Sequence, residues 1–143
     1  MEERSFIIEN IVSHMRSVGN LHSEIVAVYL FGSVLTRDNP EDIDIAVLVD
    51  EKQLERSRYP FPYLGSLISE LNELGLDKEI DVVLLNSASP IICMQVLCTG
   101  KKVFERNGKA VIEFMVQAMG RYQDLKIIRK PIEQNILQGR IYG

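Results

Sequence analysis

This chain of 143 residues contains no tryptophan, only two histidines and only two cysteines. Cys93 and Cys98 cannot build a disulfide framework, and we expect both to be small buried side chains of a reduced, cytoplasmic protein. His14 and His22 lack the spacing of metal ligands and have no partner that would complete a catalytic triad. The scarcity of these residues therefore argues against a histidine-based metal site and against Ser-His-Asp chemistry.

Long apolar runs and an excess of positive charge are also missing. No run approaches the ~18–20 apolar residues of a membrane-spanning helix. The first ten residues, MEERSFIIEN, lack the cationic and apolar segments of a signal peptide. The net charge of −4 argues against broad, salt-driven binding to nucleic acid. We therefore expect no membrane association and no direct contact with nucleic acid.

What is present is an ordinary globular composition, with 46% hydrophobic and 25% charged residues. We expect one domain over residues 1–143, ending in a long helix. Apolar periodicity, glycine stops and proline breaks define the elements. They are a helix over 6–18 before Gly19, strands over 24–31 and 43–49, a helix over 61–74 before Gly75, a strand over 79–85, a helix from Ser89-Pro90 to about 97, an edge strand over 101–105, the longest helix over 109–129 before Pro131, and a short helix over 132–138. This order predicts an α+β fold with a small mixed β-sheet flanked by helices.

The chain is organised around residues 29–49, YLFGSVLTRDNPEDIDIAVLV. An apolar strand leads into Gly32-Ser33, and a short polar loop leads to a second strand that opens with Asp42 and Asp44. Side chains two apart on a strand share a face, so the two carboxylates lie together with the intervening isoleucine on the other face. A turn that can hold phosphate beside paired carboxylates is suited to nucleotide chemistry.

A third carboxylate, Asp81, stands near the start of the next apolar strand. If it meets the first two, three carboxylates repel one another unless a cation is bound. Mg²⁺ prefers such oxygen ligands, and two Mg²⁺ ions about 3.5–4 Å apart can hold both oxygens of an in-line phosphoryl displacement. A lone Gly-Ser or a lone DxD is common in surface turns, whereas the combination with Asp81 favours a functional site. Asp77 and Glu79 are nearby acids that could take the place of Asp81.

The Gly-Ser turn, the DxD pair and the later carboxylate resemble the signature of the DNA polymerase β-type nucleotidyltransferase superfamily. The third strand IDVVLLN, the following SASPIICMQVLCTGKKVFER and the closing FMVQAMGRYQDLK are similar to the minimal nucleotidyltransferase (MNT) antitoxins of HEPN/MNT toxin–antitoxin pairs. The resemblance covers nearly the whole chain and implies a polymerase β-like nucleotidyltransferase fold.

The resemblance also implies roles for individual residues. Gly32 and Ser33 would hold the phosphates of ATP through backbone N–H groups and the serine hydroxyl. Asp42 and Asp44 would ligate two Mg²⁺ ions, and Asp81 would complete the second metal site and activate the attacking hydroxyl. In the subgroup that hydroxyl is a tyrosine of a cognate HEPN toxin, and transfer of AMP to it blocks the toxin.

The sequence departs from the family pattern in one place. Eight residues, 34–41, separate Ser33 from Asp42, and this loop is shorter than is common in the family. The arginine and glycine that often follow the Gly-Ser turn are replaced by Thr36-Arg37. Arg37 could reach the triphosphate or remain a solvated loop residue.

Three functions remain open from the sequence. The first is a Mg²⁺-dependent adenylyltransferase that modifies a HEPN partner and so acts as an antitoxin. The second, suggested by the short loop, is a non-catalytic antitoxin that neutralises its partner by occlusion. The third is a small-molecule nucleotidyltransferase of the antibiotic-modifying kind, for which 143 residues leave little room unless the chain forms a homo-oligomer.

Two features near the C-terminus carry alternatives. Met115, Met119 and Tyr122 are expected to pack in the core, with partner docking as the second interpretation. The basic side chains that follow either form a solvated face or contact a partner; they are Lys126, Arg129, Lys130 and Arg140.

Overall fold

The fold is built on a single four-stranded sheet in the computed structural model, which describes residues 2–38, 40–55, 59, 61–73 and 78–125. The strand order is β3-β2-β1-β4. The strands are β1 (Ile25–Phe31), β2 (Asp42–Val49), β3 (Glu79–Leu84) and β4 (Lys101–Glu105). β1 is antiparallel to β2 and to β4, whereas β2 and β3 are parallel. The predicted mixed sheet, with residues 101–105 at its edge, is confirmed, and so is the α+β class.

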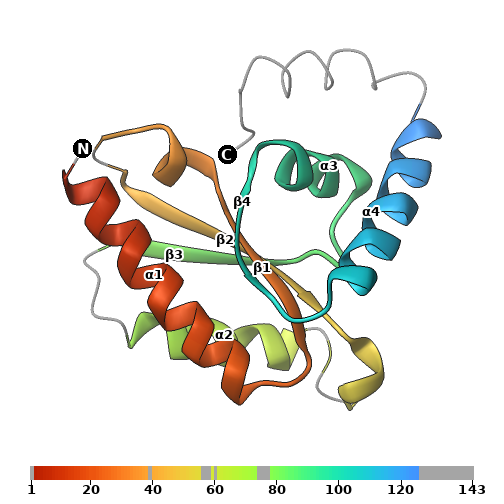
Figure 1. Ribbon diagram of the computed structural model, residues 1–143, viewed down its shortest axis with the longest axis horizontal. Coiled ribbons are helices and arrows are strands. Elements are labelled where there is room, and N and C mark those ends of the chain that lie inside the picture. The colour runs from red at the N-terminus through yellow and green to blue at the C-terminus, as the bar shows by residue number, and fades with distance from the viewer. Residues whose placement is uncertain (1, 39, 56–58, 60, 74–77, 126–143) are drawn as a thin grey trace.

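Helices cover both faces of the sheet (Figure 1). α1 (Glu2–Leu21) and α2 (Phe61–Asn72) lie on one face, and α3 (Pro90–Thr99) and α4 (Gly108–Gln123) lie on the other. Two short 3₁₀ helices, η1 (Gly32–Leu35) and η2 (Glu51–Gln53), follow β1 and β2. Among these described elements, none is both long enough and apolar enough to cross a membrane.

Strand alternation produces two apolar cores. β1 is buried at every position, as expected for a strand covered on both faces. The core under α1 and α2 takes one set of alternate strand residues, and the core under α3 and α4 takes the other. The first includes Ile7, Ile11, Met15, Leu67, Leu71, Ile43, Ile45, Ile80 and Val82, and the second includes Tyr29, Phe31, Ala46, Cys93, Val96, Val111 and Ala118.

Side-chain caps fix the starts of the helices on the second face. The Ser89 hydroxyl accepts a hydrogen bond from the Ile92 N–H, and Pro90 occupies the first turn of α3, as the sequence predicted. Asn107 caps α4 in the same way by accepting from the Ala110 N–H. These local signals explain why the two starts could be read from sequence.

Two helix boundaries differ from the predictions. Gly19 does not end the first helix, since α1 continues to Leu21. Its lack of a side chain has another reason: a Cβ there would lie 2.4 Å from the Phe104 ring. α4 ends at Gln123, well before residue 129, because the Asp124 N–H turns back to the Arg121 carbonyl. α1 therefore has 20 residues and α4 has 16, so α4 is not the longest helix.

Two side chains that were expected inside are exposed. Met119 is 48% exposed although Met115 and Tyr122 pack inward, so the apolar stripe of α4 is wider than its buried face. Cys98 is exposed whereas Cys93 is buried, because five residues along a helix turn the side chain away from the starting face. The predicted stop at Gly75 and everything predicted beyond residue 125 lie outside the described residues.

Candidate active site

The Gly-Ser turn begins directly where β1 ends. Gly32 has φ +83°, the only left-handed backbone conformation among the described residues. A Cβ at this position would lie 2.2 Å from Oδ2 of Asp44. Glycine is therefore required twice, for the turn itself and for the close approach of its backbone to the carboxylate on β2. The sequence predicted the turn, and the structure adds the contact.

The loop after the turn folds back onto Ser33. The Ser33 carbonyl accepts hydrogen bonds from the Thr36 N–H at 3.1 Å and the Arg37 N–H at 2.8 Å. The Ser33 hydroxyl oxygen lies 3.5 Å from the Asp42 carbonyl oxygen, so it sits beside the start of β2. Arg37 is exposed. The eight-residue loop between Ser33 and Asp42 is thus partly ordered by η1 and still brings the turn next to the first carboxylate.

The sheet register gathers the three predicted carboxylates at one end. Asp44 pairs with Phe31 of β1 on one side and with Asp81 of β3 on the other. Ile43 and Ile45 are fully buried in the core under α1 and α2. Asp42, Asp44 and Asp81 therefore project from the opposite face, the one that α3 and α4 cover. The predicted shared face is confirmed, and Asp81 rather than Glu79 is the β3 acid opposite Asp44.

Asp44 is the electrostatic centre of this group. Burial, followed by repulsion from Asp81 and then from Asp42, raises the pKa of Asp44 from 3.8 to about 6. The half-buried carboxylate thus carries an unfavourable charge near neutral pH, and a bound cation would remove the repulsion.

The donor chemistry of the site fits Mg²⁺, which takes carboxylate, water and phosphate oxygens. No group of three or more His, Cys, Asp or Glu side chains is arranged as a metal cage within the described ranges. This agrees with the usual habit of Mg²⁺, which is held by one or two carboxylates and completed by substrate phosphates. The expected ligand set of Asp42, Asp44 and Asp81 is therefore brought to one end of the sheet but is not drawn into a closed cage.

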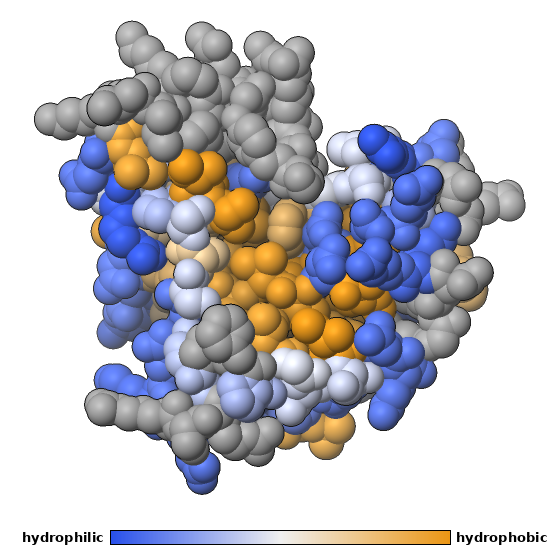
Figure 2. Space-filling model, turned by 180° about the vertical axis from the view of Figure 1, so that it is seen from behind, coloured by the Kyte–Doolittle hydropathy of each residue, from blue (hydrophilic) through white to orange (hydrophobic). Residues whose placement is uncertain are grey.

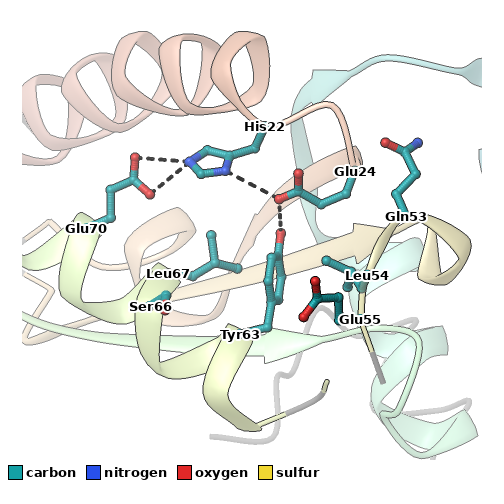
Figure 3. Close-up of a pocket in the computed structure, with 9 residues that line it drawn as sticks. All are labelled: His22, Glu24, Gln53, Leu54, Glu55, Tyr63, Ser66, Leu67 and Glu70. Atoms are coloured by element: carbon teal, nitrogen blue, oxygen red, sulfur yellow. Dashed lines mark hydrogen bonds and ion pairs between the residues drawn. The ribbon is translucent and has the colours of Figure 1, made fainter. Parts of the chain in front are cut away.

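A hollow lies at the opposite end of the sheet from these carboxylates, where β1 begins (Figure 3). It has a volume of about 310 Å³. His22 bridges two carboxylates: its Nε2 lies 3.1 Å from Glu70 Oε2, and its Nδ1 lies 3.4 Å from Glu24 Oε2. The Tyr63 hydroxyl donates to Glu24 at 2.8 Å. These contacts join α2 to the start of β1, at the other end of the strand from Asp44. No local pattern in the chain predicts them.

The fold and the site together define a nucleotidyltransferase. The fold is a mixed sheet with helices on both faces, and the site combines a Gly-Ser turn after β1 with carboxylates on β2 and β3. Residues 14–109 match the family described as "Polymerase beta, Nucleotidyltransferase", and the chain belongs to this family. It is also 30% identical over 112 residues to the protein adenylyltransferase MntA of Shewanella oneidensis strain MR-1, an alignment that covers 77% of this chain and 75% of MntA.

Solved structures agree with this relationship. A toxin–antitoxin crystal structure with AMP-PNP contains a chain that is 29% identical, with a TM-score of 0.62; the match covers 90% of this chain and 97% of that one. A structure of a tri-AMPylated Shewanella oneidensis HEPN toxin in complex with its MNT antitoxin contains a chain that is 28% identical, also with a TM-score of 0.62 and with 90% and 96% coverage. The predicted family, fold and MntA-type subgroup are confirmed, and the chain is a homologue of a protein adenylyltransferase.

Proposed function

We propose that this chain transfers AMP from ATP to a tyrosine hydroxyl of a partner HEPN protein, and that this modification neutralises the partner as a toxin. The observation that carries the proposal is the Gly32 backbone held against Asp44, with Asp81 opposite Asp44 in the register. This supplies a phosphate-binding turn and two facing carboxylates at one end of the sheet. The homology to MntA and to the antitoxin of the tri-AMPylated toxin complex supports the choice of acceptor.

In this proposal, Gly32 and Ser33 bind the phosphates of ATP through backbone N–H groups and the serine hydroxyl. Asp42 and Asp44 hold Mg²⁺, and Asp81 completes the site. When bound, the metal would neutralise charge on the phosphoryl oxygens that the three carboxylates would otherwise repel. Arg37 is exposed in the loop four residues after Ser33 and contributes a positive charge to the triphosphate in this proposal.

The reaction balances without any further reagent. The tyrosine oxygen forms a bond to the α-phosphorus, and the bond from that phosphorus to the bridging oxygen of the β-phosphate breaks. Pyrophosphate leaves with the electron pair, and the hydroxyl proton passes to the Asp81 carboxylate. The products are a tyrosyl-AMP ester and pyrophosphate.

The direct test is to incubate the purified chain with α-labelled ATP, Mg²⁺ and a purified HEPN protein as the candidate partner. We expect label on the HEPN protein, release of pyrophosphate, and no transfer by Asp44→Asn. Glu113→Gln is the matched control, because it removes one carboxylate from the exposed surface of α4 and should transfer label at the wild-type rate. Absence of label with the wild type, or equal transfer by Asp44→Asn, contradicts the proposal.

Occlusion without catalysis is the second candidate, and the short loop after Ser33 favours it. It predicts that the triple variant Asp42→Asn, Asp44→Asn, Asp81→Asn still protects cells from the partner. Loss of protection in a variant that still binds the partner rejects occlusion and leaves the enzymatic proposal.

A further inference from the structure

The two edges of the sheet differ in how they are protected against pairing with another chain. β4 carries Lys101 and Lys102, and its register with β1 is broken by a bulge. Lysines and bulges are the usual devices that keep an edge strand unpaired. β3, with the sequence EIDVVL, has neither lysine nor proline, and its pairing with β2 runs without a shift from Glu79 to Leu84. β3 is therefore an edge strand of regular register, and its exposed charged side chains are the acids Glu79 and Asp81.

The backbone groups that face this edge can be assigned. The Leu85 N–H donates to the Val47 carbonyl at 2.9 Å, so residue 85 directs its polar backbone toward β2. Since the direction of the backbone groups alternates along a strand, Ile80, Val82 and Leu84 direct their N–H and C=O groups away from β2. The Leu84 carbonyl already accepts hydrogen bonds from the Ser87 N–H at 3.2 Å and the Ser87 hydroxyl at 3.4 Å, so Leu84 offers only its N–H to a further strand. No described strand lies beyond them.

The exposed side chains of this edge strand are acidic: Glu79 and Asp81 are exposed, whereas Ile80, Val82 and Leu84 are buried. Figure 2, seen from behind the view of Figure 1, shows hydrophobic residues in the centre of that face with hydrophilic residues around them. Val83 is the partly buried apolar residue of β3 on the catalytic side. Glu79 and Glu41, two acids that the proposed reaction does not use, are exposed at the start of β3 and just before β2, at the end of the sheet where Asp42 pairs with Glu79.

The position of the carboxylates fixes the direction from which an acceptor arrives. The phosphate-binding turn follows β1, Asp44 is on β2, and Asp81 is on β3. The nucleotide therefore occupies the β1 side, and a hydroxyl that reaches Asp81 has to enter from the β3 side. A strand paired with β3 would place its own side chain beside Asp81 on the catalytic face.

We propose, on the basis of the function proposed above, that the partner presents its acceptor tyrosine on an extended segment that pairs with β3 as a fifth strand. Main-chain hydrogen bonds to Ile80, Val82 and Leu84 provide the affinity, and the tyrosine projects toward Asp81. This is recognition by strand addition. The exposed acids at Glu41 and Glu79 select a segment with basic rather than acidic residues beside the tyrosine.

The test uses the full chain with ATP, Mg²⁺ and synthetic peptides that span the acceptor tyrosine of the candidate HEPN protein. One peptide carries N-methyl groups on alternate residues, and a matched peptide carries them on the intervening residues. We expect one pattern to raise KM by about tenfold, corresponding to about one to two lost hydrogen bonds, and the other to act like the unmodified peptide. Equal KM values for the two patterns overturn strand addition and leave the adenylyltransferase proposal standing. If no AMP is transferred to any peptide or to the intact HEPN protein, the adenylyltransferase proposal itself is rejected.

Amide hydrogen exchange, followed residue by residue by NMR, provides a second measurement. Binding of the intact HEPN protein should slow exchange at Ile80, Val82 and Leu84, while Asp81 and Val83, already bonded to β2, change little. Slowed exchange confined to α4, or slowed exchange at β3 in the chain alone as its concentration rises, overturns the inference. The first result would place the partner elsewhere, and the second would make a second copy of this chain the occupant.

Discussion

Replacing Asp44 by asparagine should stabilise the metal-free protein while it abolishes AMP transfer. Asp44 lies half-buried between the Gly32 backbone and Asp81, and its pKa is raised from 3.8 to about 6 by burial first and by its two acidic neighbours second. Asparagine keeps the shape of the side chain and removes the charge. The substitution therefore removes the energy of desolvation and charge repulsion at Asp44, which destabilises the folded protein and is absent from the unfolded chain.

The size and sign of the effect follow from proton linkage. A pKa raised from 3.8 to about 6 corresponds to about 3 kcal/mol, and because the group is partly exposed we discount this to about 1–2 kcal/mol. The folded state binds the proton more tightly than the unfolded state. The contribution of Asp44 to the free energy of unfolding is therefore most favourable below the unfolded pKa of about 3.9, where the carboxyl group is protonated in both states. This contribution is lost as pH rises through about 6.

The assay is urea unfolding in the presence of a chelator at pH 7.5 and at pH 4.5. Asp44→Asn should be more stable than wild type by about 1–2 kcal/mol at the higher pH, and this gain should shrink at the lower pH. Asp81→Asn should give a smaller gain, since repulsion is the second cause of the shift, and Glu113→Gln should give none. A destabilised Asp44→Asn, or a gain that is the same at both pH values, would show that the charge of Asp44 does not destabilise the folded protein.

Three further substitutions probe separate parts of the fold. Gly32→Ala should cost about 1–2 kcal/mol from its left-handed conformation and should also abolish AMP transfer, measured with labelled ATP, because its Cβ would displace the carboxylate beside it. Asn86→Ala removes both hydrogen bonds between the Asn86 side chain and the Val49 backbone, and urea unfolding should show a loss of about 1–3 kcal/mol in the free energy of unfolding. The rate of AMP transfer should not change, because Val49 lies at the other end of β2 from the carboxylates. Gly19→Ala places a Cβ 2.4 Å from the Phe104 ring and should lower stability by about 1–3 kcal/mol in the same measurement. Wild-type stability of any of these variants would show that the contact concerned does not constrain the fold.

Elements with a strong local signal were predicted well. The strands around the Gly-Ser turn, the Ser89-Pro90 helix start and the edge strand over 101–105 depend on apolar alternation and capping, which neighbouring residues specify. The predictions failed where a distant residue decides the outcome. Gly19 looked like a helix stop but is a contact for Phe104 on β4, and the exposure of Met119 and Cys98 depends on which helix face meets the sheet.

Local sequence pattern was sufficient to locate the candidate site residues: a Gly-Ser turn, two carboxylates on one face of a strand, and a third acid on a later apolar strand. These follow from local spacing, because alternation along a strand is fixed by its backbone. The three-dimensional arrangement was needed to show that Asp81 stands opposite Asp44, that the Gly32 backbone lies against that carboxylate, and that β3 is an edge strand of the four-stranded sheet. Register and strand order arise from packing between segments far apart in the chain, and no local pattern encodes them.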